Sequence, residues 1–384
     1  MMNTRIVQVI DDLEIGGAEK LLVTFADQAR IHHIDLTVIS LSSNYDQIVI
    51  DELTARGAKV HILPARHLTD LKRLFQLCRF LSRGNFDLVH CHLLYANIIG
   101  SLCGWIARLP VITTLHSTMP DFGRFRGIKV LLESWIMRHL AADVIAVGYT
   151  VADANRKRLR GLPIRVILNA VSIPGRISKV ERDRLRMEIT GSTSRPIVIS
   201  VGRFAPPKGY PDLLAAIALL RSNFPNMLLL MVGDGPLYHE IHSLAAELGL
   251  GDQVIFSGFR NDVDQLLAAS DIYISSSHWE GLPLATLEAM AAGLPVITTA
   301  VGDAPQIITS EVGILVPPHQ PSLLAEAIAR LLDKPNEARS MGMAAREKAT
   351  RDFSPDAWMD KLLGLYQGLV RNDLTRTGEE NASL

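Results

Sequence analysis

The clearest candidates for ligand binding are two glutamates in a segment whose other residues are almost all apolar or small. Glu280 follows Trp279, and Glu288 stands eight positions later, in HWEGLPLATLEAMAAGLPVI over residues 278–297. Carboxylates accept hydrogen bonds from sugar hydroxyl groups, and the free amides of a helix expected from Pro283 onward can meet phosphate oxygens. The segment therefore has the groups needed to hold a phosphorylated sugar. A structural alternative remains, with Glu280 as a helix cap and Glu288 in a salt bridge.

Two cations, Arg203 and Lys208, lie in a Gly/Pro-rich loop, GRFAPPKG, between a predicted strand and a predicted helix. Arg can bind a diphosphate in a bidentate manner, and Lys adds a point charge. The alternative is a pair of solvated surface charges. Their position after a strand favours a binding site, because open α/β sheets bind ligands at the carboxyl ends of their strands.

Two adjacent glycines, Gly16 and Gly17, open the helix that follows the first predicted strand. Because they lack side chains, a ligand can approach the unpaired amides of the helix start, which favour an anion. The alternative is a tight strand-to-helix turn. Neither this turn nor the GDGPLY stretch at Gly233 completes the G-x-G-x-x-G dinucleotide fingerprint, so a nicotinamide-dependent enzyme is not expected.

Histidines and a D-x-D pair are further candidates. His90 and His92 follow one predicted strand and His116 follows another. A lone histidine is more often structural than functional, and His116 is favoured because it ends its strand where a ligand cleft is expected. Asp262 and Asp264 could hold a metal–diphosphate, but they open a predicted helix, where carboxylates favour the positive helix end. We interpret them as a helix start and expect neither a metal ion nor a cofactor.

Short apolar, β-branched runs alternate with longer helical patterns along the whole chain. Such runs are expected where a parallel sheet is covered on both faces. They stand at RIVQVI, DLTVISL, KVHIL, DLVHC, VITTLH and DVIAV in the first half, and at RPIVISVG, NMLLLMVG, QVIFSG, DIYISSS and PVITT in the second. Two rounds of alternation predict an α/β protein with two doubly wound, Rossmann-like domains that face a central cleft.

Domain boundaries are expected where this pattern is interrupted. Pro and Gly break it in NAVSIPGRISK, which separates an N-terminal domain over 1–172 from a C-terminal domain over 173–353. A helix over 354–371 has an apolar side and is expected to return to the N-terminal domain. The polar remainder, 372–384, is expected to be disordered.

The charges are divided unevenly between the two halves. Residues 1–172 carry 20 Lys and Arg against 15 Asp and Glu, whereas the remainder carries 19 against 25. The basic half is expected to face something anionic, but the overall net charge of −1 argues against a general nucleic-acid binder. The three cysteines lack metal-ligand spacing and fit buried thiols of a reducing cytosol. A cytoplasmic protein is therefore expected.

In their order and spacing, these motifs resemble those of the retaining nucleotide-sugar glycosyltransferases of family 4, also known as group 1 glycosyltransferases, which have the GT-B fold. The resemblance rests on the E-x7-E of Glu280 and Glu288, the GRFAPPKG loop and the N-terminal GGAE, and VGDGP and LNAV agree with it. It covers nearly the whole chain.

The resemblance implies that the C-terminal domain binds a nucleotide-diphosphate sugar and the N-terminal domain binds a saccharide or lipid-linked saccharide acceptor. Arg203 and Lys208 would hold the diphosphate. Glu280 would bond hydroxyls of the donor sugar, and Glu288 those of the ribose. The implied catalytic residues are Arg203, Lys208, Glu280 and His116, and the implied donor-binding residues are Gly16, Gly17, Gly281, Leu282, Leu284 and Glu288, with no metal ligands.

The resemblance also has a departure and alternatives. Gly17 would approach the phosphate and His116 would line the sugar pocket, but Ser117 stands where many members have Asp, which leaves the acceptor pocket open. The alternative functions are an epimerase or phosphorylase on the same architecture, or a catalytically silent binding protein. The intact Arg203, Lys208, Glu280 and Glu288 argue against the silent protein.

A basic, aromatic-bearing segment follows His116, in STMPDFGRFRGIKVLLESWIMRHL over residues 117–140. Its cations are interleaved with apolar residues, as in segments that lie on anionic lipid. This pattern predicts docking on the inner face of a membrane, where a lipid-linked saccharide would be presented. The alternative of an amphipathic helix packed on its own domain stays open.

Overall fold

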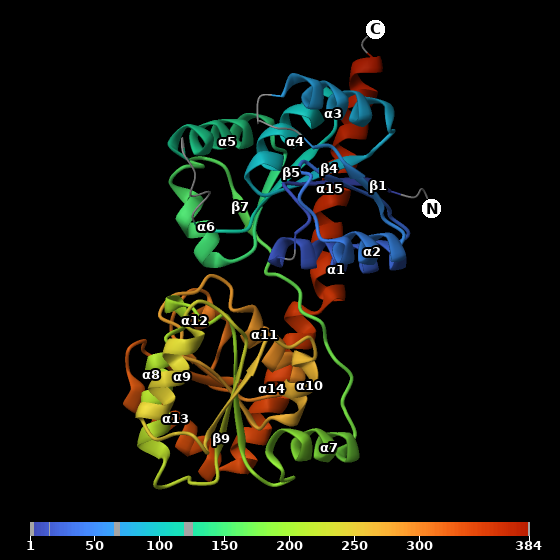
Figure 1. Cartoon of the computed structure of the whole chain (residues 1–384). Coiled ribbons are helices and arrows are strands. Elements are labelled where there is room, and N and C mark those ends of the chain that lie inside the picture. The colour runs from blue at the N-terminus through green and yellow to red at the C-terminus, as the bar shows by residue number, and fades with distance from the viewer. Residues whose placement is uncertain (1–3, 15, 65–69, 119–125, 383–384) are drawn as a thin grey trace. The chain divides into compact units, whose positions relative to one another are not determined.

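The computed structural model describes residues 4–14, 16–64, 70–118 and 126–382. The chain divides into two compact units, an N-terminal unit of Met1–Ala170 and Pro355–Leu384, and a C-terminal unit of Val171–Ser354 (Figure 1). Each unit contains one parallel β-sheet with helices packed against it. The predicted α/β class with two doubly wound domains is confirmed.

The sheet of the N-terminal unit has seven strands in the order β3-β2-β1-β4-β5-β6-β7, and every pair is parallel. The order reverses between β1 and β4, which is where such sheets bind ligands. The strands are β1 (Arg5–Ile10), β2 (Asp35–Ser40), β3 (Lys59–Ile62), β4 (Leu88–His92), β5 (Val111–Leu115), β6 (Asp143–Ala146) and β7 (Ile164–Val166).

Two groups of helices cover this sheet, and each shares its own apolar cluster with the strands. One cluster contains side chains of α1, α2 and α15, and the other contains side chains of α3, α4 and α5. The helices are α1 (Gly17–Ile31), α2 (Gln47–Ala55), α3 (Leu71–Arg83), α4 (Leu94–Ile106), α5 (Arg126–Leu140), α6 (Tyr149–Arg156) and α15 (Pro355–Ala382).

The C-terminal helix α15 is part of the core of the N-terminal unit. Trp358 and Tyr366 pack against Phe25 of α1, with ring centroids 6.1 Å and 6.2 Å apart. The helix continues to Ala382, whereas the sequence predicts disorder from residue 372. The polar composition of this stretch motivated that expectation, but the stretch contains no proline to end a helix already begun at Pro355.

The sheet of the C-terminal unit has six parallel strands in the order β10-β9-β8-β11-β12-β13. Its order reverses between β8 and β11, so the loops that follow these two strands are neighbours at the carboxyl edge of the sheet. The strands are β8 (Ile197–Val201), β9 (Leu228–Val232), β10 (Val254–Gly258), β11 (Ile272–Ser275), β12 (Val296–Thr299) and β13 (Gly313–Val316).

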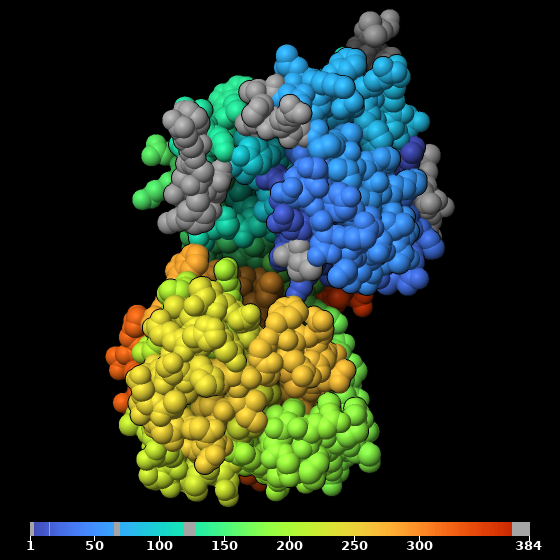
Figure 2. All heavy atoms as spheres, in the orientation of Figure 1, coloured from blue at the N-terminus to red at the C-terminus, as the bar shows by residue number. Residues whose placement is uncertain are grey.

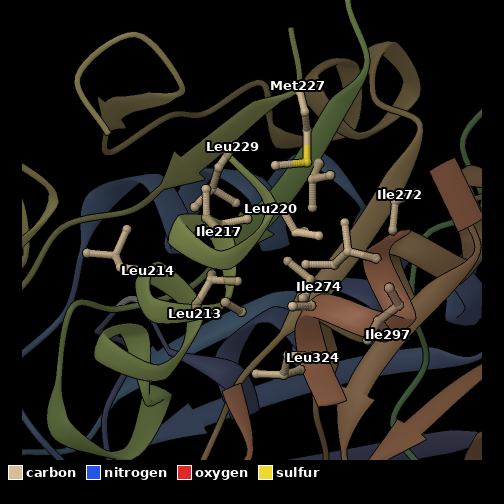
Figure 3. Close-up of a cluster of buried hydrophobic side chains, with 14 of the residues drawn as sticks. Leu213, Leu214, Ile217, Leu220, Met227, Leu229, Ile272, Ile274, Ile297 and Leu324 are labelled. Carbon is tan, nitrogen blue, oxygen red and sulfur yellow. The ribbon is translucent and has the colours of Figure 1, made fainter. Parts of the chain in front are cut away.

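Helices pack on this sheet through a large apolar core. Leu213 and Ile217 of α8 meet Leu229 of β9 and Leu324 of α13 in a buried cluster (Figure 3). Figure 2 shows α7, in green, beside α10, in amber, on the surface of the unit. The helices are α7 (Lys179–Thr190), the 3-10 turn η1 (Pro206–Lys208), α8 (Tyr210–Leu220), α9 (Tyr238–Glu247), α10 (Val263–Ala269), α11 (Leu284–Ala292), α12 (Ala304–Ile307), α13 (Pro321–Asp333) and α14 (Pro335–Phe353).

Two strands, β7 and β13, are absent from the sequence prediction. They have three and four residues, and each stands at the edge of its sheet. A run of three residues such as β7 carries little periodic signal. Strand β13 is as long as β3, β6, β11 and β12, which the sequence did predict, so its length alone does not explain why it was missed. Within the part of the chain that the structure describes, no helix is both long and apolar enough to cross a membrane.

Candidate active site

The loops after β8 and β11 bring Lys208 and Glu280 into direct contact. Lys208 Nζ lies 2.5 Å from Glu280 Oε1, and the Ser277 hydroxyl donates a hydrogen bond of 2.7 Å to the same oxygen. The exposed fractions of the two charged side chains are 26% and 17%. The ion pair is therefore largely buried at the carboxyl edge of the sheet. Both side chains are already held in position before a ligand binds, so binding does not have to order them.

Glycines let the loops of this site pack backbone against backbone. Gly209 has a φ of 60°, and a Cβ there would lie 2.2 Å from the carbonyl oxygen of Ser276. A Cβ at Gly233 would lie 2.1 Å from the carbonyl oxygen of Gly202. The VGDGP motif thus supports the loop of Arg203 and Lys208 from the neighbouring strand β9.

Helix α11 begins at Leu284 and carries Glu288 at the border of its buried face. Leu287 and Met290 are fully buried, whereas Glu288 is half-buried. Gly281, Leu282 and Leu284 are half-buried as well, so the rest of the unit does not cover the start of the helix. The predicted donor-binding residues of this segment therefore adjoin Glu280.

Arg203 lies on the same loop as Lys208, and its side chain is exposed. It follows Gly202 and precedes Phe204, which is fully buried. The buried Phe204 anchors the loop while Arg203 faces solvent. The structure therefore brings Lys208 and Glu280 together and leaves Arg203 accessible beside them.

The D-x-D pair stands at a helix start, as the sequence predicts. Asp262 immediately precedes α10, and Asp264 is the second residue of that helix. Arg260 binds Asp262 with an N–O distance of 2.5 Å, and this hydrogen bond lowers the pKa of Asp262. Asp262 is thus already occupied by a neighbouring cation.

In the N-terminal unit, Gly16 is the N-cap of α1 and Gly17 is its first residue. A Cβ at Gly16 would lie 2.3 Å from Glu19 Oε2, whereas no described atom lies within 4 Å of a Cβ at Gly17. Gly16 makes room for the Glu19 carboxyl, whose pKa burial raises to about 7. The backbone at Gly17 has open space around it.

The three histidines form a buried network. His90 Nδ1 lies 2.8 Å from the Tyr366 hydroxyl and His90 Nε2 lies 2.6 Å from Thr114 Oγ1, while His92 Nδ1 lies 3.1 Å from His116 Nε2. Burial lowers the pKa of His90 to about 3, that of His116 to about 4, and that of His92 well below its usual range. All three imidazoles are neutral at neutral pH, and His90 connects two strands to α15.

A pocket of about 220 Å³ lies beside His116 at the carboxyl ends of β1, β4 and β5. Glu133 in this pocket accepts hydrogen bonds from Arg158 (2.7 Å) and Asn97 (2.9 Å), and Asp11 accepts them from two backbone amides at the start of α4. Burial raises the pKa of both carboxyls, that of Asp11 to about 7. The pocket is lined by Asp11, Leu93, Leu94, Tyr95, Asn97, Thr114, Leu115, His116, Ser117, Glu133 and Arg158.

Sequence reasoning missed several polar residues of these sites. Asp11 directly follows the first strand, so its position could have identified it as a candidate. Ser277 could have been found in the same way, because it follows β11. Glu133 and Arg158 carry no such signal, because they meet only through the packing of two segments that are 25 positions apart.

Comparison with known proteins identifies the family. Residues 15–173 match the family model Glycosyltransferase Family 4, and residues 181–348 match Glycosyl transferases group 1. The chain is 30% identical over 311 residues to D-inositol 3-phosphate glycosyltransferase of Corynebacterium glutamicum, covering 75% of this chain and 73% of that one. It is 29% identical over 344 residues to N-acetyl-alpha-D-glucosaminyl L-malate synthase of Bacillus anthracis, covering 87% of each. The chain belongs to the group 1 glycosyltransferases of family 4.

Solved structures match the fold over nearly the whole chain. Anabaena HepE in complex with UDP superposes with a TM-score of 0.84 at 23% identity, covering 95% of this chain and 100% of that one. The complex of HepE with UDP-glucose has a TM-score of 0.78 at 23% identity, covering 96% and 100%. At these identities the likeness concerns the fold, and it confirms the predicted GT-B fold class with two Rossmann-like domains.

The raised pKa of Asp11 predicts how Asp11→Asn changes stability with pH. The unfolded chain ionises this carboxyl near pH 4 and the folded chain only near 7, so its ionisation destabilises the fold as pH rises through that interval. The variant should therefore gain stability relative to wild type by up to about 1.4 kcal/mol per pH unit between those values. Urea unfolding at several pH values measures this difference.

The exposed Asp252→Asn serves as the matched control and should show no such trend. A stability difference between Asp11→Asn and wild type that does not change with pH would contradict the assignment.

Proposed function

We propose that this protein is a retaining glycosyltransferase that moves a sugar from a nucleotide diphosphate to a saccharide or lipid-linked saccharide, in the synthesis of a cell-surface polysaccharide or glycolipid. The observation that carries the proposal is the contact of Lys208 with Glu280 where the strand order of the C-terminal sheet reverses. Ligands of open α/β sheets bind at this point. The cation would bind the diphosphate of a nucleotide sugar, and the adjacent carboxylate would accept hydrogen bonds from the sugar hydroxyls.

The names of related proteins support the donor and acceptor classes. HepE has been solved with UDP and with UDP-glucose. An Escherichia coli relative, 27% identical over 79% of this chain and 81% of its own length, is named UDP-Gal:alpha-D-GlcNAc-diphosphoundecaprenol alpha-1,3-galactosyltransferase. That name joins a nucleotide-sugar donor to a lipid-linked acceptor. UDP-sugars are accordingly the first donors to test.

In the proposed donor complex, Arg203 and Lys208 bind the diphosphate, Glu280 bonds the donor sugar and Glu288 the ribose. The backbone amides of Gly281 and Leu282, just before the helix start, add hydrogen-bond donors. When the bond between the anomeric carbon and the diphosphate oxygen breaks, negative charge grows on the diphosphate. Cations and amides already in position stabilise that charge without a metal ion.

Two carboxylates that line the pocket beside His116 are already bound by neighbouring groups, and this supports a one-step route to retention. A two-step route needs a free carboxylate as nucleophile, but Glu133 is bound by Arg158 and Asn97, and Asp11 by two amides. We therefore favour front-face attack through an oxocarbenium-like state. The acceptor oxygen bonds the anomeric carbon, and its proton passes to the leaving diphosphate.

The pocket beside His116 is the proposed acceptor subsite. Arg158 is the cation that lines it, and its charge is compensated by Glu133 at 2.7 Å. The remaining polar groups are carboxyl, imidazole, amide and hydroxyl groups, which suit the hydroxyls of a neutral saccharide better than a phosphate. An acceptor sugar is therefore expected to bind here through hydrogen bonds.

A donor panel tests the proposed function. Incubated with UDP-, GDP- and ADP-sugars, the protein should release nucleoside diphosphate from one donor, and release should persist in excess EDTA. An epimerase would instead change the sugar without needing an acceptor, a phosphorylase would require inorganic phosphate, and a silent binding protein would show a thermal shift without release. Loss of release in EDTA that Mg²⁺ or Mn²⁺ restores would contradict metal independence.

Removal of either cation of the donor loop should slow turnover while the fold persists. Arg203→Ala and Lys208→Ala each remove a stabiliser of the charge on the leaving diphosphate, which typically costs about 3 kcal/mol, or roughly a hundredfold in kcat. Steady-state kinetics measure the loss. Lys179→Ala, an exposed cation of α7, is the matched control and should have wild-type rates. Wild-type rates in both loop variants would exclude the proposed diphosphate contacts.

The two glutamates should separate kinetically. Glu280→Gln keeps the size of the side chain but removes its charge beside the reacting sugar, so kcat should fall. Glu288→Gln should mainly raise KM for the donor, because the ribose is remote from the bond that breaks. Exposed Glu247→Gln on α9 is the control. If both variants bind the donor and turn over as wild type does, the glutamates are structural.

Helix α5 combines a packed face with an exposed apolar face. Ile136 and Met137 are buried in the unit, whereas Ile128, Leu131, Leu132 and Trp135 have exposed fractions between 41% and 70%. These four exposed positions follow the i, i+3, i+4, i+7 spacing of one helical face. An apolar stripe of this kind on a solvent-exposed surface marks an interaction site.

We propose that this face docks on an anionic membrane. Residues 71–140 carry nine Lys and Arg against three Asp and Glu, so the composition of this segment favours an anionic partner. Leu71 and Phe75 of α3 are also exposed, by 76% and 65%, and α3 packs on α4 as α5 does. An inner-membrane surface would present a lipid-linked acceptor to the protein.

Vesicle co-sedimentation tests the docking. Binding should require anionic lipid, weaken with salt, and fall when Leu131 and Trp135 become Gln. Substitution of Arg124, Arg126 and Lys129 by Gln should weaken it as well, although Arg124 lies outside the described residues. The control Leu219→Gln removes a leucine of α8 that is 59% exposed, against 70% for Leu131. Failure of the wild-type protein to bind anionic vesicles at low salt would indicate a soluble acceptor.

A further inference from the structure

Three metal-ligating side chains from distant parts of the sequence meet in the C-terminal unit. Asp212 Oδ2 lies 2.7 Å from His278 Nε2 and 3.7 Å from His319 Nδ1. One ligand atom of each residue lies within 4.8 Å of the other two. We propose that Asp212, His278 and His319 form a binding site for a zinc-type divalent cation, distinct from the residues assigned to the donor.

The topology explains why these residues meet. Asp212 lies in the first turn of α8, His278 follows β11, and His319 precedes α13. Because all strands are parallel, α8 and α13 both begin at the carboxyl edge of the sheet, and the two helices pack against one another. Their starts therefore converge beside the loop that carries His278.

The geometry brings the three ligand atoms to separations near those of a metal site. One carboxylate oxygen faces two imidazole nitrogens, and only His278 is within hydrogen-bond distance of it. The two rings lie 3.8 Å apart between centroids. Ligand atoms of a tetrahedral zinc ion are about 3.3 Å apart, since each lies about 2.0–2.1 Å from the metal. The observed separations of 2.7 Å and 3.7 Å fall on either side of that value.

The backbone at His319 has a conformation that few residues other than glycine adopt. Its φ is 59°, in the left-handed region, which costs a non-glycine residue about 1–2 kcal/mol. Its side chain is 65% exposed, so burial does not repay this strain. A ligand role is compatible with this conformation, but the exposed His33 has a similar φ of 55°, so the proposal rests on the three converging side chains. The exposure also leaves a coordination position for water.

The three side chains that would bind the ion decide the class of cation. Two imidazoles and one carboxylate suit Zn²⁺, Co²⁺ or Ni²⁺, whereas Mg²⁺ and Ca²⁺ prefer oxygen ligands. The His278 amide donates a hydrogen bond of 2.8 Å to the Pro207 carbonyl. A bound ion would therefore tie the segment before α13 to both loops of the donor site and stabilise the unit. The transfer reaction is proposed to need no metal. Occupancy of this site is therefore tested by metal binding and by protein stability, not by activity.

Metal titration of the untagged, chelator-treated full chain tests the site. Zn²⁺ should bind with a calorimetric stoichiometry of one and raise the Tm in a concentration-dependent manner. Co²⁺ should give the visible d–d absorption of a low-symmetry site with nitrogen ligands, and Mg²⁺ should do neither. His319→Asn should weaken Zn²⁺ binding at least about tenfold and remove the rise in Tm, without altering the Tm of the metal-free protein.

His319→Asn is the decisive variant because Asn tolerates the left-handed conformation, so loss of the ligand does not introduce strain. His278→Gln should have the same effect on binding. His239→Asn, an exposed histidine of α9 in the same unit, is the matched control and should bind Zn²⁺ as wild type does. Absence of Zn²⁺ uptake by the wild type, or equal uptake by His319→Asn, would overturn the proposal.

Discussion

Parallel pairing of every strand within each sheet determines where this protein can do chemistry. In a parallel sheet the carboxyl ends of the strands share one edge, so residues that follow different strands meet there regardless of their separation in the chain. Lys208 and Glu280, 72 positions apart, meet for this reason, and so do Asp212, His278 and His319. The close backbone contacts at Gly209 and Gly233 depend on the same edge, because they join loops that follow neighbouring strands.

The N-terminal unit must bury several polar groups at and near the carboxyl edge of its own sheet. Asp11 and Glu19 have pKa values raised to about 7 because burial disfavours their charged forms, and three imidazoles are held neutral. Ionised carboxyls of this kind destabilise the folded state at neutral pH. Perturbed groups of this kind cluster at functional sites more than elsewhere. Helix α15 offsets part of this cost, because Trp358 extends the apolar core and the Tyr366 hydroxyl partners His90.

Helix α5 shows how one segment can satisfy two interpretations of its sequence. An amphipathic pattern is compatible with packing on the helix's own domain and with docking on lipid. In the structure Ile136 and Met137 serve the first purpose, while Leu131 and Trp135 remain exposed beside them. An apolar stripe outside the packed face therefore stays available to a partner, and the membrane is the partner that we propose.

The sequence by itself determined the class of fold, the two-domain plan and the family, because each follows from local signals: alternating apolar runs, and loops such as GRFAPPKG and HWEG placed after them. It also predicted that Arg203, Lys208 and Glu280 follow strands at one edge, since position after a strand is readable along the chain, and the structure shows Lys208 and Glu280 in contact there. Strand β7 was not predicted because three residues carry no usable period, and β13, which is as long as several predicted strands, was also missed at the edge of its sheet. The contacts of Glu133 with Arg158, of His90 with Tyr366 and of Asp212 with two histidines were decided only by tertiary structure. The physical reason is that these contacts depend on strand order and on which helices pack together, and neither can be predicted from the spacing of neighbouring residues.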